Sequence, residues 1–117
     1  MRTFKNKKIQ VGEKETQRAV IQYLETRKNF LVFWRNNTAT IFVTQSNGKR
    51  GMIRSGTLGS PDIFVVKDGV TYGLEIKGSD ENKSVQSDNQ RVFQLWFEQC
   101  GGKYFIIRSI DEVMKML

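Results

Sequence analysis

Residues 59–77, GSPDIFVVKDGVTYGLEIK, constrain the fold more than any other stretch of the chain. Asp68-Gly69 separates two apolar runs, which is the strongest short-range signal for a β-hairpin and suits a type I′ turn. If these two residues form the loop, Lys67 pairs with Val70. This pairing sets the register of both strands, because the side chains of a hairpin alternate between its two faces.

The predicted register brings two carboxylates together, because it places Asp62 directly opposite Glu75. Directly opposed side chains share a face, with Cβ atoms about 4.5–5.5 Å apart. Lys77, two residues beyond Glu75, falls on the same face by alternation. Opposed carboxylates repel each other unless a divalent cation lies between them. By itself, the trio is either the minimum equipment for metal-dependent phosphodiester hydrolysis or a surface salt-bridge cluster on a hairpin. The opposite face, which we expect to be core, receives Ile63, Val65, Leu74 and Ile76.

The trio and the short motifs before and after it follow one another along the chain in an order that resembles a nuclease family. Pro61-Asp62 followed by Glu75-Ile76-Lys77 is similar to the motif of the PD-(D/E)XK nuclease superfamily. Flanking motifs narrow the resemblance to the VRR-NUC (virus-type replication-repair nuclease) family, including its small single-domain phage and bacterial members. These flanks, which run from residue 13 to near the C-terminus, are EKETQ at 13–17, Arg35-Asn36-Asn37-Thr38, Gly59, Gln90 and Gly101-Gly102.

The resemblance implies a restriction-endonuclease-like α/β core, with a mixed central β-sheet flanked by helices, around a metal site. Asp62 and Glu75 would hold the metal. The backbone carbonyl of Ile76 would add a ligand, and Glu13 would contribute directly or through water. Lys77 would either position the attacking water or balance charge on a phosphate oxygen, and the sequence leaves both roles open.

The chain has no histidine and a single cysteine, Cys100. Zinc sites built from Cys and His are thereby excluded. Any metal must be held by oxygen ligands, which suit Mg²⁺ or Mn²⁺. One cysteine also excludes an internal disulfide and fits a reducing compartment, so we expect an intracellular protein, in the cytoplasm of a bacterium or of a phage-infected cell.

Nineteen Lys and Arg residues against twelve Asp and Glu residues give a net charge of +7 in 117 residues. Such an excess predicts a polyanionic partner, most simply DNA. The length suits one domain, which we divide into a basic N-terminal arm, 1–12, and a nuclease domain, 13–117. Neither a membrane span nor a signal peptide is apparent, so we expect no membrane partner.

In the first half, residues 13–28 have a helical pattern, and Glu13 lies in line with its buried stripe. That position suits either a favourable interaction with the helix dipole or a place at the metal site. Residues 30–35 and 40–44 predict strands, and 46–60 predicts a long irregular loop. Such a loop is either a solvated surface or a mobile arm that grips phosphates near the cleft. The residues expected to contact DNA are Lys49, Arg50, Arg54, Arg35 and Asn36.

In the second half, a loop at 78–86 leads to a capping box formed by Ser87 and Gln90. Gln90 thus has a structural explanation, while the resemblance also places it beside the catalytic residues. The helix is predicted to run to about Cys100 and to end at Gly101. A strand at 103–108 and a helix with a second capping box, Ser109 to Glu112, follow. The helix that begins at this Ser87 capping box is expected to bury a stripe made of Phe93, Trp96, Phe97 and Cys100.

The function expected from these features is that of a metal-dependent DNA endonuclease acting on branched DNA, such as a four-way junction. Single-domain members of the resembled family act as dimers, so a homodimer is expected. Two alternatives remain at this level: a non-catalytic nucleic-acid-binding module, and a restriction-type endonuclease that reads a sequence. Basic charge and aromatic residues permit the binding module, but they do not require an acid pair.

Overall fold

The structure, a computed structural model, describes residues 10–36, 39–82 and 85–117, and for 39–41 and 53–55 the backbone alone. Most of the predicted N-terminal arm, 1–12, therefore lies outside the described residues. Asn37 and Thr38 do so as well. The elements are α1 (Glu13–Glu25), β1 (Val32–Arg35), β2 (Ala39–Thr44), β3 (Arg50–Ser55), β4 (Ile63–Lys67), β5 (Val70–Ile76), α2 (Asp88–Gln99), β6 (Lys103–Ile107) and α3 (Ile110–Met116).

The central sheet has four strands in the order β1-β4-β5-β6. The first three are antiparallel, and β6 runs parallel to β5, so the sheet is mixed. The predicted hairpin register is confirmed, because Lys67 pairs with Val70. Asp68 and Gly69 have φ values of 51° and 77°, which is the conformation that a type I′ turn requires.

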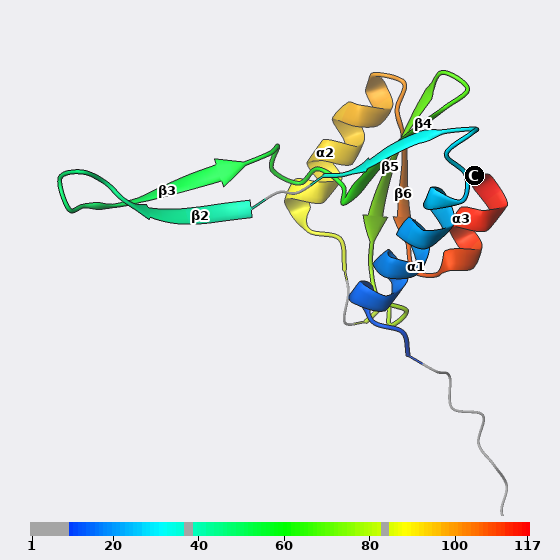
Figure 1. The fold of residues 1–117 in the computed structure, drawn as a ribbon, viewed down its shortest axis with the longest axis horizontal. Coiled ribbons are helices and arrows are strands. Elements are labelled where there is room, and N and C mark those ends of the chain that lie inside the picture. Colours follow the sequence, from blue (N-terminus) through cyan, green and yellow to red (C-terminus); the bar gives the residue numbers. More distant parts are fainter. Residues whose placement is uncertain (1–9, 37–38, 83–84) are drawn as a thin grey trace, which may run out of the picture.

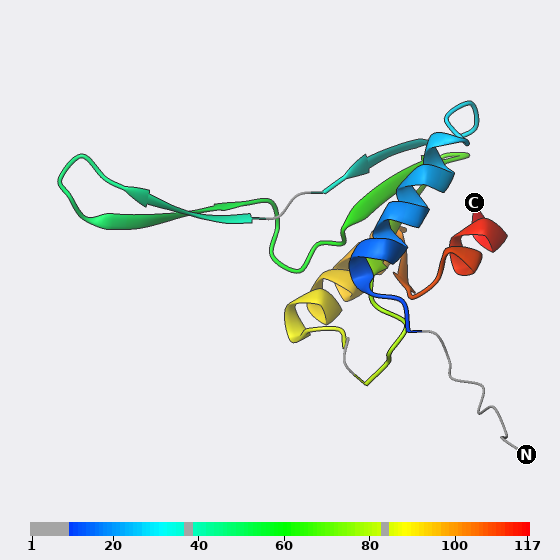
Figure 2. The same ribbon diagram turned by 60° about the horizontal axis from the view of Figure 1, so that its bottom comes forward.

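Helices cover both faces of the sheet, so the predicted α/β architecture is confirmed (Figures 1 and 2). Helices α1 and α3 lie on the face that carries the side chains of Ile63 and Leu74, and α2 lies on the face that carries Phe64. None of the described helices is long and apolar enough to cross a bilayer. The main core lies between the sheet and α1 and α3, and it consists of Val20, Leu24, Leu31, Ile63, Val65, Leu74, Ile76, Ile107, Val113 and Leu117.

The predicted buried stripe of α2 is wrong for two of its four members, Trp96 and Cys100. Trp96 is 64% exposed, and Cys100 is exposed as well. Phe93 and Phe97 are half-buried, and their rings pack at a tilt against Phe64, with ring centroids 6.5 and 6.0 Å from it. The helix is rotated so that Gln90 also faces inward, which it does because its amide is bonded to groups on the sheet. Gln90 is three residues before Phe93 and seven before Phe97, so helical periodicity places this polar residue on the same face as the two rings.

The predicted irregular loop at 46–60 is also wrong, because it contains β3. This strand pairs with β2 in antiparallel register, from Ala39↔Ser55 to Thr44↔Arg50, as a sheet of its own. The hairpin extends away from the body along the longest dimension of the molecule, 70 Å (Figure 1). We call these two strands and their turn the β2–β3 arm. Accordingly, the strands that begin at Val32 and Ala39 belong to different sheets.

Two further details differ from expectation. The N-cap of α3, Ser109, makes no side-chain capping bond. Instead, Glu112 Oε1 accepts from the backbone N–H of Arg108 at 3.3 Å and from Ser109 Oγ at 3.5 Å, so no capping box forms. At the other end of the chain, α1 ends at Glu25, three residues earlier than predicted.

Candidate active site

Asp62 lies one residue before β4, at the end of the sheet where β5 finishes. Since Ile63 pairs with Leu74, the next position of the register sets Asp62 against Glu75, as the hairpin count predicts. The side chain is anchored across the strands, because Asp62 Oδ2 accepts from the backbone N–H of Ile76 at 2.7 Å. The core side chains Ile63 and Leu74 alternate with the acids, so the two carboxyls occupy the opposite face, toward α2.

Glu75 is only 4% exposed, and burial raises the pKa of its carboxyl to about 8. The charge of Asp62 raises this pKa further, while Lys77 acts against the shift. Burial raises the pKa of Asp62 as well, although the Ile76 N–H opposes that shift. The two carboxyls lie close enough for protonated Glu75 to donate to Asp62. Without a cation, the pair therefore retains a proton near neutral pH.

Lys77 and Gln90 complete a hydrogen-bonded cluster around Glu75. Lys77 is 8% exposed, and its Nζ lies 3.7 Å from Glu75 Oε1. Gln90 Nε2 donates to the same oxygen over 2.8 Å, and Gln90 Oε1 accepts from Lys77 Nζ at 3.1 Å. Gln90 thereby fixes both the acid and the lysine of the predicted trio.

Gln90 holds this position because it is also part of a helix cap. The predicted capping box at the start of α2 is confirmed: Gln90 N donates to Ser87 Oγ over 3.2 Å, and Ser87 N donates to Gln90 Oε1 over 2.9 Å. The same amide oxygen serves the cap and the lysine, while the amide nitrogen serves Glu75. Both roles considered for Gln90 from the sequence are therefore compatible in one geometry.

Glu13 is the first residue of α1 and is exposed, and its charge raises the pKa of both Asp62 and Glu75. Two bonds hold the start of α1 beside the end of β5: Ser79 N donates to Val11 O over 2.9 Å, and Val11 N donates to Ser79 Oγ over 2.7 Å. In the described part of the chain, no three Asp, Glu, His or Cys side chains gather as a metal-binding group. Glu13 thus lies close enough to the acid pair for its charge to act on both carboxyls.

The pair itself fits a hard divalent cation. Its donors are carboxylate oxygens, which Mg²⁺ and Mn²⁺ prefer. Glu75 Oε2 is buried, and among the described residues it accepts no hydrogen bond from a permanent donor. A buried acceptor of this kind is costly unless a proton or a cation satisfies it. Burial of the Glu75 carboxyl thus raises its pKa in the metal-free pair and also leaves Oε2 suited to bind a cation.

Sequence reasoning missed Tyr104, which lies on β6 opposite Gly73 and is 7% exposed. Burial raises the pKa of its hydroxyl to about 12, and the charges of Glu75 and Asp62 add to the shift, while the Gln86 amide acts in the opposite direction. Tyr104 thus forms part of the wall beside the acid pair. Only the parallel pairing of β6 with β5 places it there, and no local pattern predicts that pairing.

The residues predicted to contact DNA lie in two separate places. Asn36 N donates to Asp62 O over 2.7 Å, and Asn36 Nδ2 donates to Ser60 Oγ and Pro61 O, so this side chain holds the segment that enters the site. Lys49 and Arg50 lie at the tip of the β2–β3 arm, away from the acid pair (Figure 1). The expectation that the basic segment grips phosphates near the cleft is therefore wrong for these two residues. Arg35 lies at the end of β1, and Arg54 lies in β3, where only its backbone is described.

Comparison with known proteins found no relative of this chain. The chain matches no protein-family model, no curated protein and no solved structure. What the site does must therefore be argued from the arrangement of Asp62, Glu75, Lys77 and Gln90 themselves.

Proposed function

We propose that this chain is a metal-dependent nuclease of the PD-(D/E)XK type, similar to the VRR-NUC family, that hydrolyses phosphodiester bonds in DNA. One observation carries the proposal: an acid pair, half-buried Asp62 and buried Glu75, shares a sheet face with Lys77, which approaches Glu75 Oε1 to 3.7 Å. Removing two acids and a lysine from water at one point costs free energy, which a bound cation would offset. Such a cluster is therefore retained where it serves a function. Perturbed pKa values that arise from burial together with a specific charge partner cluster at functional sites.

In this proposal, Asp62 and Glu75 hold Mg²⁺ or Mn²⁺, with the Ile76 carbonyl as a further ligand and Glu13 acting through water. When bound, the metal supplies charge neutralisation at the phosphate and activation of the attacking water. Lys77 brings a positive charge to the same point, where it orients that water or stabilises the charge that develops on a phosphate oxygen. Gln90 is a positioning residue, because it holds Glu75 and Lys77 through one amide.

DNA is the proposed substrate because the net charge is +7 and the β2–β3 arm carries Lys49 and Arg50 at its tip. A module that only binds DNA has no use for a buried acid pair, since uncompensated carboxylates repel phosphate. A cleavage assay separates the two functions. Labelled single strands, duplex, flaps and four-way junctions are incubated with Mg²⁺, Mn²⁺ or EDTA.

We expect cleavage with either metal and none in EDTA. The Asp62→Asn, Glu75→Gln and Lys77→Ala variants should each lose activity by about 10²–10⁴ while remaining folded and able to bind DNA. Lys67→Ala, which removes the same charge at the other end of the hairpin, is the matched control and should keep full activity. Near-normal turnover by Lys77→Ala would overturn the proposed role of the trio.

We further propose that the nuclease is a homodimer that cuts four-way junctions at paired positions. A two-fold dimer would match the symmetry of a junction with two active sites. The outward face of α2 supports this, because Val92, Leu95 and Trp96 are 47%, 57% and 64% exposed. Beside them lies a hollow of about 240 Å³, which Leu58 and Phe93 help to line.

Light scattering at micromolar concentration tests the assembly. We expect a dimer for the wild type and a monomer for Trp96→Glu, which leaves the fold intact because Trp96 is exposed in the single chain. Lys103→Gln, on exposed surface of β6, also lowers the net charge by one and is the control for the charge change. A wild-type monomer that prefers flaps or single strands would overturn the junction-resolving dimer and leave the nuclease standing.

A further inference from the structure

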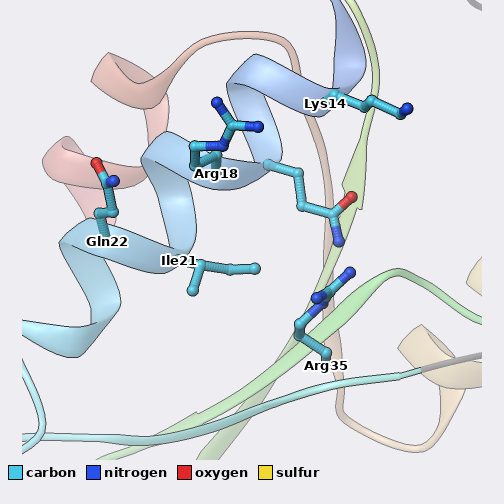
Figure 3. Close-up of a pocket in the computed structure, with 6 residues that line it drawn as sticks. Lys14, Arg18, Ile21, Gln22 and Arg35 are labelled. Atoms are coloured by element: carbon cyan, nitrogen blue, oxygen red, sulfur yellow. The ribbon is translucent and has the colours of Figure 1, made fainter.

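A pocket lined mainly by charged and amide side chains lies between α1 and the end of β1 (Figure 3). Its volume is about 510 Å³. The lining contains three cations, two amides, one aliphatic side chain and no carboxylate. The lining residues are Lys14, Gln17, Arg18, Ile21, Gln22 and Arg35.

The cations of this pocket lack counterions among the described residues. Lys14, Arg18 and Arg35 form no ion pair within the part of the chain that the structure describes. Lys14 and Arg18 are four residues apart on one helix, a spacing at which like charges destabilise the helix. Arg35 reaches the same space from the sheet (Figure 3). An anion between these side chains would remove the repulsion.

Two short connections join the pocket to the acid pair. Arg35 pairs with Ile63, the residue after Asp62, and its neighbour Asn36 donates its N–H to Asp62 O over 2.7 Å. On the helix side, Lys14 directly follows Glu13, whose charge acts on both acids. The pocket therefore adjoins the site of the proposed chemistry and is held in place by the same strand end.

We propose that this pocket is a phosphate-binding site, which holds a backbone phosphate of the cleaved DNA strand next to the phosphodiester that is hydrolysed. The guanidinium groups of Arg18 and Arg35 are the donors best suited to a phosphate, because each can form two parallel hydrogen bonds. The amides of Gln17 and Gln22 supply further donors, and Ile21 offers a contact for deoxyribose. The pocket works without metal, and it positions the strand so that the next phosphate lies at the acid pair.

This inference rests on the proposed nuclease function, so its test measures binding apart from cleavage. The parent is Glu75→Gln, which is not expected to cut. Short DNA strands carry one neutral methylphosphonate each, at successive positions around the bond that the wild type cuts. Affinities are measured for the parent and for the parent with Arg35→Gln or Arg18→Gln, and with Lys67→Gln as the control that removes one positive charge elsewhere.

We expect each arginine variant to bind unmodified DNA about ten-fold more weakly, as for the loss of a hydrogen-bonded charge pair. The slope of log affinity against log salt should fall by about one unit. A methylphosphonate at one position near the cut should weaken binding by the parent about ten-fold, the same factor as an arginine substitution. The arginine variants should bind this modified strand as well as they bind unmodified DNA, because the contact is already lost. Lys67→Gln should keep the full sensitivity at that position.

Two results would overturn the pocket alone: equal weakening by Arg35→Gln, Arg18→Gln and Lys67→Gln, or arginine variants that stay sensitive at every methylphosphonate position. Either would mean that these charges act only through the general field of the protein. A parent that binds no DNA at all would overturn the nuclease proposal together with the pocket. If the wild type cleaves DNA normally but the arginine substitutions have no specific effect on binding, the nuclease proposal stands and only the phosphate-binding pocket is rejected. The two failures are therefore distinguishable.

Discussion

The side-chain amide of Gln90 donates to Glu75 Oε1 over 2.8 Å, from a helix that starts only two residues earlier. The first turn of α2 and the buried acid at the end of β5 are therefore parts of one hydrogen-bonded unit. Ser87 belongs to this unit only through the cap, whereas Gln90 belongs to both the cap and the site. The two residues can be separated by mutation.

Ser87→Ala should lower the free energy of unfolding by about 1 kcal/mol, the usual effect of losing an N-cap. It should leave cleavage near normal, because among the described residues Ser87 makes no bond to Glu75 or Lys77. Gln90→Ala should lose similar stability and also most of its activity, since Glu75 and Lys77 both lose their partner. Urea unfolding and single-turnover cleavage measure the two effects. Equal activity of the two variants would show that Gln90 acts only as a cap.

Stability should fall as the pH rises in the metal-free protein. The pKa of Glu75 is about 8 in the folded chain and near its ordinary value of 4.5 when unfolded. Between these values the folded state keeps a proton that the unfolded state has lost, so the free energy of unfolding decreases with pH across this window and is highest below it. Asp62, whose pKa is also raised, acts in the same direction.

Urea unfolding in EDTA at several pH values between 4.5 and 8 measures this dependence. Glu75→Gln cannot titrate at this position, so the difference between its curve and that of the wild type isolates the Glu75 contribution from other ionisable groups. A wild-type curve parallel to that of Glu75→Gln would contradict the raised pKa.

Gly59 should tolerate substitution far less well than Gly69, although both have φ near +80°. A Cβ at Gly69 meets nothing within 4 Å, whereas a Cβ at Gly59 would lie 2.2 Å from the backbone oxygen of Asn89 in α2. Gly69→Ala should therefore cost about 1–2 kcal/mol for its left-handed backbone alone. Gly59→Ala should cost about 1–3 kcal/mol more, through forced displacement of α2, and should reduce activity by moving Gln90. Equal losses of stability and activity would show that this contact does not position α2.

The hairpin and the capping box could be predicted because each depends on residues that are close in sequence. A two-residue turn determines the pairing of every later position, so the meeting of Asp62 and Glu75 follows from Asp68 and Gly69. Gln90 lies three residues from Ser87 and is covered by the same local rule.

The remaining features depend on contacts between distant segments. Strand β3 was missed because its Gly51 and the nearby glycines resemble a loop, although Asn47-Gly48 was an available hairpin signal. In α2, Trp96 and Cys100 were misassigned to the buried face because they fit the helical stripe, although they are exposed. Tyr104 required the parallel pairing of β6 with β5, a pairing that no short motif specifies.

Cleavage should require Mg²⁺ or Mn²⁺ and should be inhibited by Ca²⁺, which offers the same charge with looser coordination. Metal should also raise the melting temperature, because it binds only the folded site. At sub-saturating Mg²⁺, activity should increase as the pH rises toward 8, since Glu75 must lose its proton before it can bind the metal. Calorimetry with and without Mg²⁺ tests the binding, and Glu75→Gln is the control that should show no shift. Full activity in EDTA would contradict the prediction.

The β2–β3 arm should contribute to DNA affinity and little to chemistry. Its strands pair with each other and with no strand of the main sheet, and isolated two-strand hairpins are marginally stable in water. Phe42 and Met52, paired across the arm, are 79% and 59% exposed, so the arm gains little from burial. Replacing Lys49, Arg50 and Arg54 by Gln should weaken binding, and the salt slope should fall by about 0.9 for each phosphate that the arm no longer neutralises.

Turnover at saturating DNA should remain near the wild-type value in this triple variant, because the arm tip is remote from Asp62 and Glu75 (Figure 1). A variant with Gln in place of Lys67, Lys103 and Lys115, three cations outside the arm, provides the matched loss of charge. If both triple variants reduce the salt slope equally, the arm makes no specific contact with DNA. If the arm variant instead loses turnover at saturation, the arm must close over the site during the reaction, and its role would be catalytic positioning rather than affinity.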